Sequence, residues 1–262
     1  MRRLLYLLIF FPLLVSAQHP VNQTDAQGLR QGPWQRNHPN GRLMYTGTFL
    51  DGRPVGEWRR YHENGQLRAI LVHGTSDTVS ARLFDERARL VAEGIYLGEK
   101  KVGLWKYYSD DRLISEETFE DGVKQGKARL FYTDGRVLEE SEWQNGMRHG
   151  AYRALFPSGN PFLECIYENG RRNGFCVSYF PSGTMEVDAF YADDLPDGEW
   201  KYYTGQGQIR YTLQYSKGVL LNPEVLYDLE TRQLEELEQK GRQIADPEKF
   251  LNNPMEYLQK NP

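Results

Sequence analysis

The feature that most constrains the fold of this chain is a repeat with a period of 23 or 24 residues. We number each copy from its first residue, as slot 0. A steady period of this length is typical of repeat proteins, in which each copy is one supersecondary unit that packs against its neighbours. The eight copies start at Gly32, Gly56, Val79, Gly103, Gly126, Gly150, Gly174 and Gly198.

Each copy has the pattern of a β-hairpin. Slots 8 and 9 hold turn pairs such as Asn64-Gly65, and such pairs between apolar segments predict a two-residue type I′ turn. Apolar residues then alternate at slots 11, 13, 15 and 17, which is the period of a half-buried strand. A second turn such as Asp51-Gly52 leads into the next copy. The predicted fold class is therefore an all-β repeat: an elongated single-layer antiparallel β-meander of about eight hairpins, with a short helical cap at the C-terminus.

Charged residues support one register for these hairpins. A two-residue turn would place slot 5 opposite slot 12, slot 3 opposite slot 14 and slot 2 opposite slot 15. Slot 3 is mostly basic and slot 14 mostly acidic, so opposite charges would face each other across the strands. The expected pairs are Arg82–Glu93, Lys106–Glu116, Arg129–Glu140 and Arg153–Glu164. Because the basic residues are matched in this way, we interpret them as structural rather than as a phosphate or lipid site.

The aromatic residues form two stripes that we expect to face opposite ways. Slot 2, together with slot 17, supplies the structural aromatic positions Trp34, Trp58, Trp105, Trp143 and Trp200. Slot 5 lies on the other face by parity, unless a bulge intervenes. We predict slot 5 as an interaction stripe, with packing between neighbouring hairpins as the alternative. Its members are Tyr61, Phe84, Tyr108, Phe131, Tyr179 and Tyr203.

The repeat resembles the MORN-repeat variant, a family of bacterial β-hairpin repeat proteins that are often labelled antitoxin-like. The stretches from Gly56 to Leu67 and from Gly198 to Tyr203 carry the resemblance best, within a region from about Gly28 to Leu221. The resemblance implies a β-meander that contacts proteins or lipids and has no chemistry of its own. The Trp-Tyr-Tyr units are also similar to choline-binding repeats of cell-surface proteins.

The N-terminus predicts export. Arg2 and Arg3 precede the apolar run from Leu4 to Val15, and small residues end at Ala17, which is the pattern of a cleaved signal peptide. We therefore expect a periplasmic, cell-envelope or secreted protein. Residues 18–31 would lead into the repeats at 32–221.

The C-terminal segment, residues 222–262, has the pattern of a helical tail. Asn222-Pro223-Glu224 is a helix-start signal, followed by leucines at helical spacing. Two further start signals, at Asp246 and Asn253, predict two short helices. We expect the tail to cover the open edge of the last hairpin, with a dimerising helix as the alternative.

No chemistry-bearing motif stands out. A net charge of −4 argues against a nucleic-acid binder. No catalytic, cofactor-binding or metal motif is recognised, and we interpret the acidic cluster Asp193, Asp194 and Asp197 as a solvated turn rather than a calcium site. Cys165 and Cys176 could pair; we slightly favour free thiols.

These observations predict an exported, non-enzymatic scaffold that binds a protein partner through one face of its sheet. The first alternative is an aromatic-box module for choline or an envelope glycan, with peripheral membrane contact also open. The second is an antitoxin-like component. The identity of the partner and the oligomeric state stay open.

Overall fold

The computed structural model describes residues 20–74 and 76–243 and divides the chain into two compact units, one up to Asp111 and one from Arg112. The expected signal peptide at residues 1–17 and the two short helices expected after residue 245 lie outside the described residues. The described part contains 19 strands and one helix. All of the strand pairs described in either unit are antiparallel.

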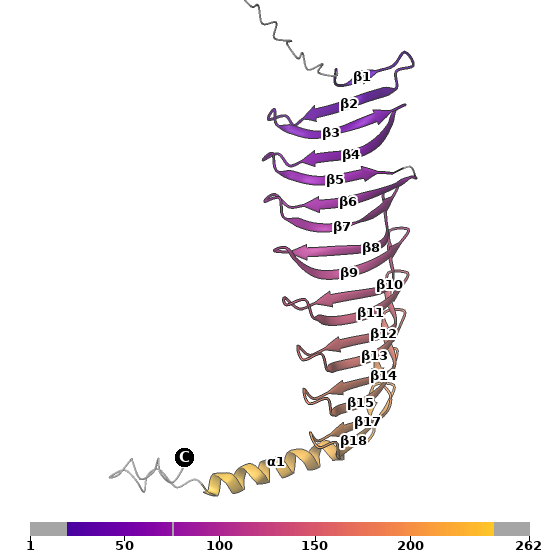
Figure 1. Cartoon of the computed structure of the whole chain (residues 1–262). Coiled ribbons are helices and arrows are strands. Elements are labelled where there is room, and N and C mark those ends of the chain that lie inside the picture. The colour runs from indigo at the N-terminus through magenta and orange to yellow at the C-terminus, as the bar shows by residue number, and fades with distance from the viewer. Residues whose placement is uncertain (1–19, 75, 244–262) are drawn as a thin grey trace, which may run out of the picture. The chain divides into compact units, whose positions relative to one another are not determined.

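The first unit is a meander in which each strand pairs with the next one along the chain (Figure 1). The strands lie side by side in one layer, as the sequence predicts. They are β1 (Gln23–Thr24), β2 (Arg30–Asn37), β3 (Leu43–Leu50), β4 (Arg53–Tyr61), β5 (Leu67–His73), β6 (Thr78–Phe84), β7 (Leu90–Leu97) and β8 (Lys100–Ser109).

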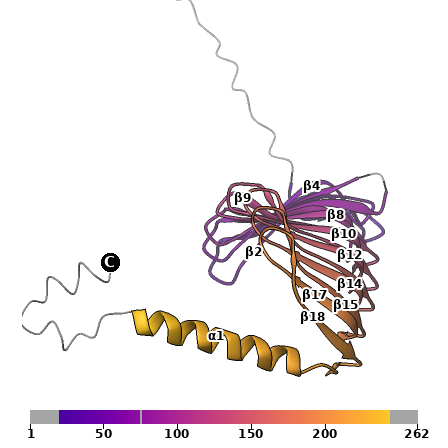
Figure 2. The same ribbon diagram turned by 90° about the horizontal axis from the view of Figure 1, so that it is seen from below.

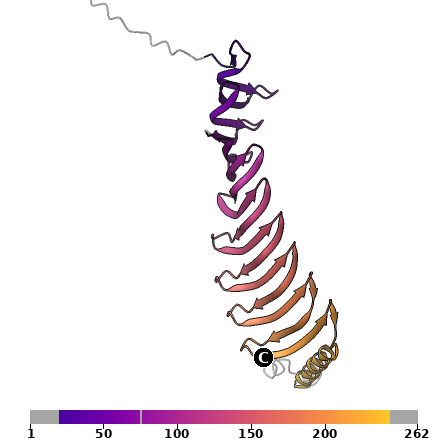
Figure 3. The same ribbon diagram turned by 90° about the vertical axis from the view of Figure 1, so that its right-hand side faces the viewer.

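The second unit continues the same pattern, and Figure 3 shows its hairpins following one another in chain order. Its strands are β9 (Arg112–Glu120), β10 (Val123–Phe131), β11 (Val137–Gln144), β12 (Met147–Leu155), β13 (Pro161–Glu168), β14 (Arg171–Tyr179), β15 (Met185–Ala192), β16 (Leu195–Pro196), β17 (Gly198–Tyr203), β18 (Ile209–Ser216) and β19 (Val219–Leu220). The helix α1 (Glu224–Gln243) follows. The predicted fold class, an antiparallel meander of hairpins that ends in a helix, is confirmed.

The turn types are exchanged relative to the prediction. In the copies that have a glycine at slot 9, only this glycine of the two turn residues has positive φ, as in Gly65 (φ 89°), and the amide of Gly65 donates to the carbonyl of His62. This is a three-residue loop with a type I turn and a glycine bulge, not a type I′ turn. The type I′ geometry occurs instead in most turns between copies, where both residues have positive φ, as in Asp51 (φ 50°) and Gly52 (φ 76°), and within the fourth copy at Asp110 and Asp111.

A bulge restores the predicted register beyond this loop. Tyr61 at slot 5 pairs with Leu67 at slot 11, not with slot 12 as expected, and the pairing shifts between Arg60 and Tyr61. The extra loop residue and the extra residue in the second strand compensate each other. Slots 3 and 2 therefore face slots 14 and 15 as predicted, for example Arg59 opposite Ile70.

The two faces of each hairpin differ in character. We call the face formed by slots 2, 4, 13, 15 and 17 the aromatic face, and the face formed by slots 1, 3, 5, 14 and 16 the charged face. The buried side chains lie on the aromatic face, and Trp105 at slot 2 is fully buried. This is where the core of each unit sits.

Packing on the aromatic face depends on matched volumes in adjacent copies. A tryptophan at slot 2 lies over slot 15 of the copy before it, and that position is then small. A Cβ atom added to Gly47 would lie 2.1 Å from the ring of Trp58, and one added to Gly94 would lie 2.3 Å from that of Trp105. Where slot 2 is Ala81, its partner at slot 15 is Leu71. Side chains thus fill the space between copies to a similar extent with different residues.

At one step of the second unit this matched pair is a disulfide. Cys165 at slot 15 and Cys176 at slot 2 are opposite each other on β13 and β14, with Cα atoms 4.1 Å apart. The slight preference of the sequence analysis for free thiols was therefore wrong. The spacing of the two residues matches the slot-15 and slot-2 positions that meet throughout the chain, which is why they can bond.

The turns at slots 6 to 9 add a second set of contacts between copies. Asn40 donates to the carbonyl of Glu63 in the next turn, and Asn64 donates to the carbonyl of Glu86. His38 lies 3.0 Å from the carbonyl of Tyr61. These side chains satisfy backbone carbonyls that a single hairpin would leave to water.

The C-terminal helix leaves the sheet rather than lying along it (Figure 2). The open edge of β18 is met by β19 and by Asn222, whose side chain accepts from the amide of Gln214 and donates to the carbonyl of Thr212. The Asn222 side chain therefore makes two hydrogen bonds to β18 of the kind that a further strand would make. Within the described residues, no helix has the length and apolar character needed to cross a membrane.

Candidate interaction surface

The slot-5 stripe lies on the charged face but is half-buried. All six predicted residues have intermediate exposure. The hydroxyl of Tyr108 donates to Glu93 at 2.7 Å, and that of Tyr179 donates to Glu164 at 2.9 Å. In both pairs the glutamate is at slot 14 of the preceding copy. Burial, followed by the bond to Glu164, raises the pKa of Tyr179. These tyrosines link neighbouring hairpins, and their rings are only partly available to a partner.

The charged residues at slots 3 and 14 are opposite each other in the hairpins as predicted. The Nε atom of Arg129 is 2.9 Å from Glu140, and that of Arg153 is 2.8 Å from Glu164. Arg82 and Glu93 are directly opposite in β6 and β7. The remaining predicted pair has Lys106 in the first unit and Glu116 in the second. Because these pairs are largely solvated, each adds little stability, but together they balance the charge of this face.

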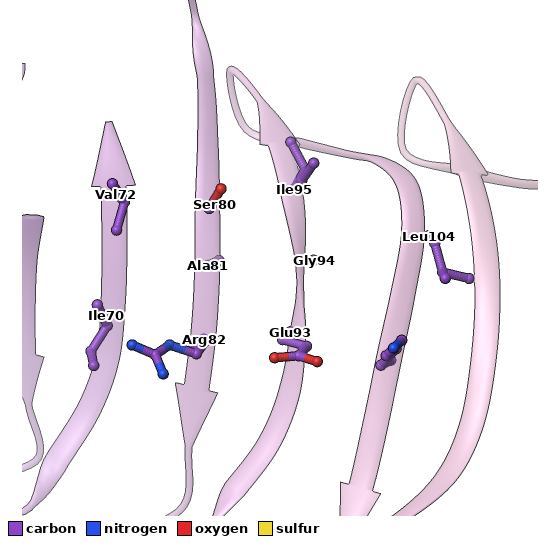
Figure 4. Close-up of a pocket in the computed structure, with 10 residues that line it drawn as sticks. Ile70, Val72, Ser80, Ala81, Arg82, Glu93, Gly94, Ile95 and Leu104 are labelled. Atoms are coloured by element: carbon purple, nitrogen blue, oxygen red, sulfur yellow. The ribbon is translucent and has the colours of Figure 1, made fainter. Parts of the chain in front are cut away.

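An apolar row that the sequence analysis did not single out runs beside the charges in the first unit. Val72, Ile95 and Leu104 occupy slots 16, 16 and 1, and their exposed fractions are 42%, 41% and 49%. Figure 4 shows Val72, Ser80 and Ile95 in one row across neighbouring strands, with Arg82 and Glu93 in the row below. These residues line a shallow hollow of about 330 Å³. The hollow combines an apolar floor with a charged rim.

The second unit has an equivalent apolar cluster at the same slots. Phe175 at slot 1 is 63% exposed, and its ring packs edge-to-face on Phe190 with centroids 5.3 Å apart. Ile166 at slot 16 is also exposed. Glu164 and Asp188 lie two residues away along the same strands, on the same face. One feature of the sequence could have revealed these clusters. Slot 16 is aromatic or aliphatic in several copies, although it points to the opposite face from the buried slots 13, 15 and 17.

The tryptophans at the predicted structural positions pack on the aromatic face. Trp58 and Trp105 are buried, while Trp34, Trp143 and Trp200 are half-buried. The indole N–H groups of Trp58, Trp105 and Trp200 donate to the slot-16 carbonyl of the preceding copy at 3.2, 3.1 and 3.0 Å. The same hydrogen bond at three steps means that slot 2 fixes how one hairpin sits on the next.

Trp143 at slot 17 is held differently from the slot-2 tryptophans. The ammonium group of Lys124 lies 3.8 Å from the centre of its ring, and the same group pairs with Glu117 at 2.9 Å. The ring therefore takes part in a cation–π contact.

The acidic cluster in the second unit has partners of its own. Arg172 donates to Asp194 at 2.8 Å, and Asp197 accepts from the amide of Lys217. Within the part of the chain that the structure describes, no group of three or more histidine, cysteine or acidic residues is arranged to hold a metal ion.

Family models match the chain in both units. The model described as MORN repeat variant matches residues 54–73 and 196–217, and the model described as MORN repeat matches residues 140–151 and 166–185. The resemblance inferred from the sequence is confirmed at these segments. Repeats of this kind are non-enzymatic modules and are generally associated with scaffolds that bind proteins or membranes. No curated protein matches the chain.

Solved structures show only low similarity. A structure titled "Crystal structure of GtfA/B complex" is 14% identical, with a TM-score of 0.24, over 39% of this chain and 18% of that one. One titled "Crystal Structure of TarM" is 10% identical, with a TM-score of 0.19, over 53% and 20%. One titled "Crystal Structure of TcdB2-TccC3-Cdc42" is 12% identical, with a TM-score of 0.23, over 76% and 13%. The matched region is thus a fifth or less of each of these proteins, and none of these similarities carries an argument about function.

Proposed function

We propose that this chain, with MORN-type repeats in both of its units, is an exported non-enzymatic scaffold that binds a protein partner through the charged face of its hairpins. The observation that carries the proposal is the exposed apolar row at slots 1 and 16. It recurs in both units, and charged residues border it each time. Apolar anchors within a polar rim are the usual anatomy of a protein interface.

Export is part of this proposal. The basic and apolar N-terminal residues have the pattern of a signal peptide, and the bond between Cys165 and Cys176 is of a kind that persists mainly in oxidising compartments. Both observations favour an envelope or secreted location over an antitoxin that acts in the cytoplasm.

An aromatic box for choline or a glycan has less support. Trp58 and Trp105 are 7% and 0% exposed, so neither offers an open ring face. A ligand of that class needs such a face for stacking or for a cation–π contact.

Site-specific photo-cross-linking tests the proposed surface. A benzoyl-phenylalanine at Ile95 or at Phe175 should cross-link the same partner in the native envelope. Leu50 is the matched control, because it is 58% exposed but lies at slot 18, beside a turn. Cross-linking at Leu50 as strong as at the two test positions would argue against a specific surface.

Binding to the purified partner then measures the contribution of the row. Ile95→Ser with Leu104→Ser should weaken binding by about tenfold or more, the effect of losing about 1.4 kcal/mol of contact energy, while Leu50→Ser should not. Far-UV circular dichroism would verify that the fold is intact. In parallel, Tyr61→Ala and Tyr203→Ala test the slot-5 stripe, and a loss of stability without a loss of affinity would assign that stripe to packing.

A further inference from the structure

A second surface feature lies on the aromatic face of the first unit. Two adjoining hollows, of about 580 and 280 Å³, share Arg60 and His73. The larger one has a floor of Ala69, Leu71 and Leu83. It opens over the third copy, where Ala81 stands at slot 2 in place of a tryptophan. The aromatic face is therefore hollowed at one place along an otherwise filled row.

This hollow carries positive charge that is not neutralised. Arg60 lines both hollows and Arg30 lines the smaller one, and neither has a carboxylate partner among the described residues. Glu99 is the one acidic residue among those that line the two hollows. By contrast, the cations on the aromatic face of the second unit are paired, as in Lys124–Glu117, Arg148–Glu139 and Arg172–Asp194. An apolar floor with arginines that lack a carboxylate partner favours a ligand that is both acidic and apolar.

The chain itself presents a surface of that chemistry on α1. Residues three and four apart lie on one face of a helix, so Leu226, Tyr227, Glu230, Leu234 and Leu237 form one stripe. Tyr227, Leu234 and Leu237 are 67%, 57% and 63% exposed. Glu230 lies in the middle of this stripe and is exposed as well. The helix projects from the end of the second unit (Figure 2), so its apolar stripe is not covered by the sheet of that unit.

We propose that the α1 stripe of one copy docks into the hollow on the first unit of a second copy, with Glu230 against Arg60. A helix that lays apolar anchors into a groove is a common recognition mode. A carboxylate and a guanidinium form the strongest ordinary charged hydrogen bonds. The pairing is heterologous, because the helix and the hollow are different surfaces. Each added copy therefore leaves one free helix and one free hollow.

Sedimentation equilibrium of the chain from Gln18 tests this proposal. The mean mass should rise with protein concentration and fall with added salt, because exposed charges are screened. Arg60→Glu and Glu230→Lys should each give a monomer. Mixed in equal amounts, they should associate again, because Glu230 of the first variant meets Arg60 of the second, and the two reversed side chains are again opposite in charge. Arg87→Glu, which reverses an exposed arginine on a turn outside the hollow, is the control and should associate like the unmodified chain.

Three results would overturn the proposal: a monomer at every concentration, association that survives both charge reversals, or a mixture of the two variants that stays monomeric. Thermal unfolding followed by circular dichroism verifies that each variant is folded. If Arg60→Glu does not fold, Leu234→Ser on the exposed helix replaces it, and unchanged association of that variant would equally exclude the helix as the ligand.

Discussion

The close approach of Trp105 to Gly94 leads to the sharpest prediction. An ideal Cβ on Gly94 would lie 2.3 Å from the Trp105 ring, which is fully buried. The backbone of Gly94 does not have positive φ, so alanine is excluded by space and not by conformation. Gly94→Ala must displace the ring, and overpacking of this kind costs about 1–3 kcal/mol. We expect a loss of stability in that range.

A double substitution tests the reason for this loss. Trp105→Ala should cost about 3–5 kcal/mol, as for other large-to-small changes in a core. Gly94→Leu combined with Trp105→Ala reproduces the Leu71–Ala81 pair one copy earlier, so it should be more stable than Trp105→Ala alone. The favourable coupling should be about 0.5–3 kcal/mol, the usual range for residues in contact.

Urea unfolding followed by far-UV circular dichroism measures these differences. Gly205→Ala is the matched control, because a Cβ there meets nothing within 4 Å and its φ is not positive. It should leave the unfolding midpoint unchanged. A neutral Gly94→Ala, or a double variant no more stable than Trp105→Ala, would refute the idea that slot 15 and the following slot 2 share one volume.

Three further predictions concern the disulfide and the titrating groups. Replacing Cys165 and Cys176 by serine should cost about 2–4 kcal/mol, and a reducing agent should have the same effect on the unmodified chain in urea unfolding. Burial, with a nearby arginine adding to it, lowers the pKa of His73 below 6.5, so stability should be complete above that pH and fall as the pH drops below it; His73→Tyr should flatten this loss in thermal melts from pH 7.5 to 5. Burial raises the pKa of Tyr202 to about 12, so stability should be lost as the pH rises from about 10 towards 12, and Tyr202→Phe should reduce the loss.

The fold could be predicted because the period and the alternation of apolar residues each point to the same hairpin. The turn type could not be predicted, because Asn-Gly suits both a two-residue turn and the end of a three-residue loop. The predicted register was nevertheless right at slots 2 and 3. The extra loop residue and the extra residue in the second strand were both unforeseen, and they compensate each other, so the charge pairs gave no sign of either.

The site was harder to predict than the fold. Parity placed Tyr108 and Tyr179 on the charged face, but it could not show that their hydroxyl groups bond to the preceding copy and draw the rings into the packing. The exposed residues Ile95 and Phe175 were missed for a different reason. The members of the exposed apolar row differ in type from copy to copy, so a search for repeated residues passes over them. Their importance comes from exposure, which depends on neighbouring strands.

The matched volumes show that the packing unit does not coincide with the repeat as counted from slot 0. Trp58 and Trp105 at slot 2 pack against the slot-15 residue of the preceding copy, so one tight contact joins two copies. A deletion of residues 79–102 removes one period. In the shortened chain, the slot-15 residue opposite Trp105 is Leu71, whereas in the intact chain it is Gly94. We expect a strained or unfolded first unit, since overpacking is destabilising.

A deletion of residues 64–86 removes a similar length, but it joins the chain at slot 8, so the hairpin turn of the second copy is replaced by that of the third. It sets Gly94 between Trp58 and Trp105, which copies the native arrangement of Gly47 between Trp34 and Trp58. We therefore expect this shortened chain to fold, with a cooperative thermal transition, while the other deletion lacks one. Equal behaviour of the two deletions would mean that the contact between copies does not decide where a repeat can be cut.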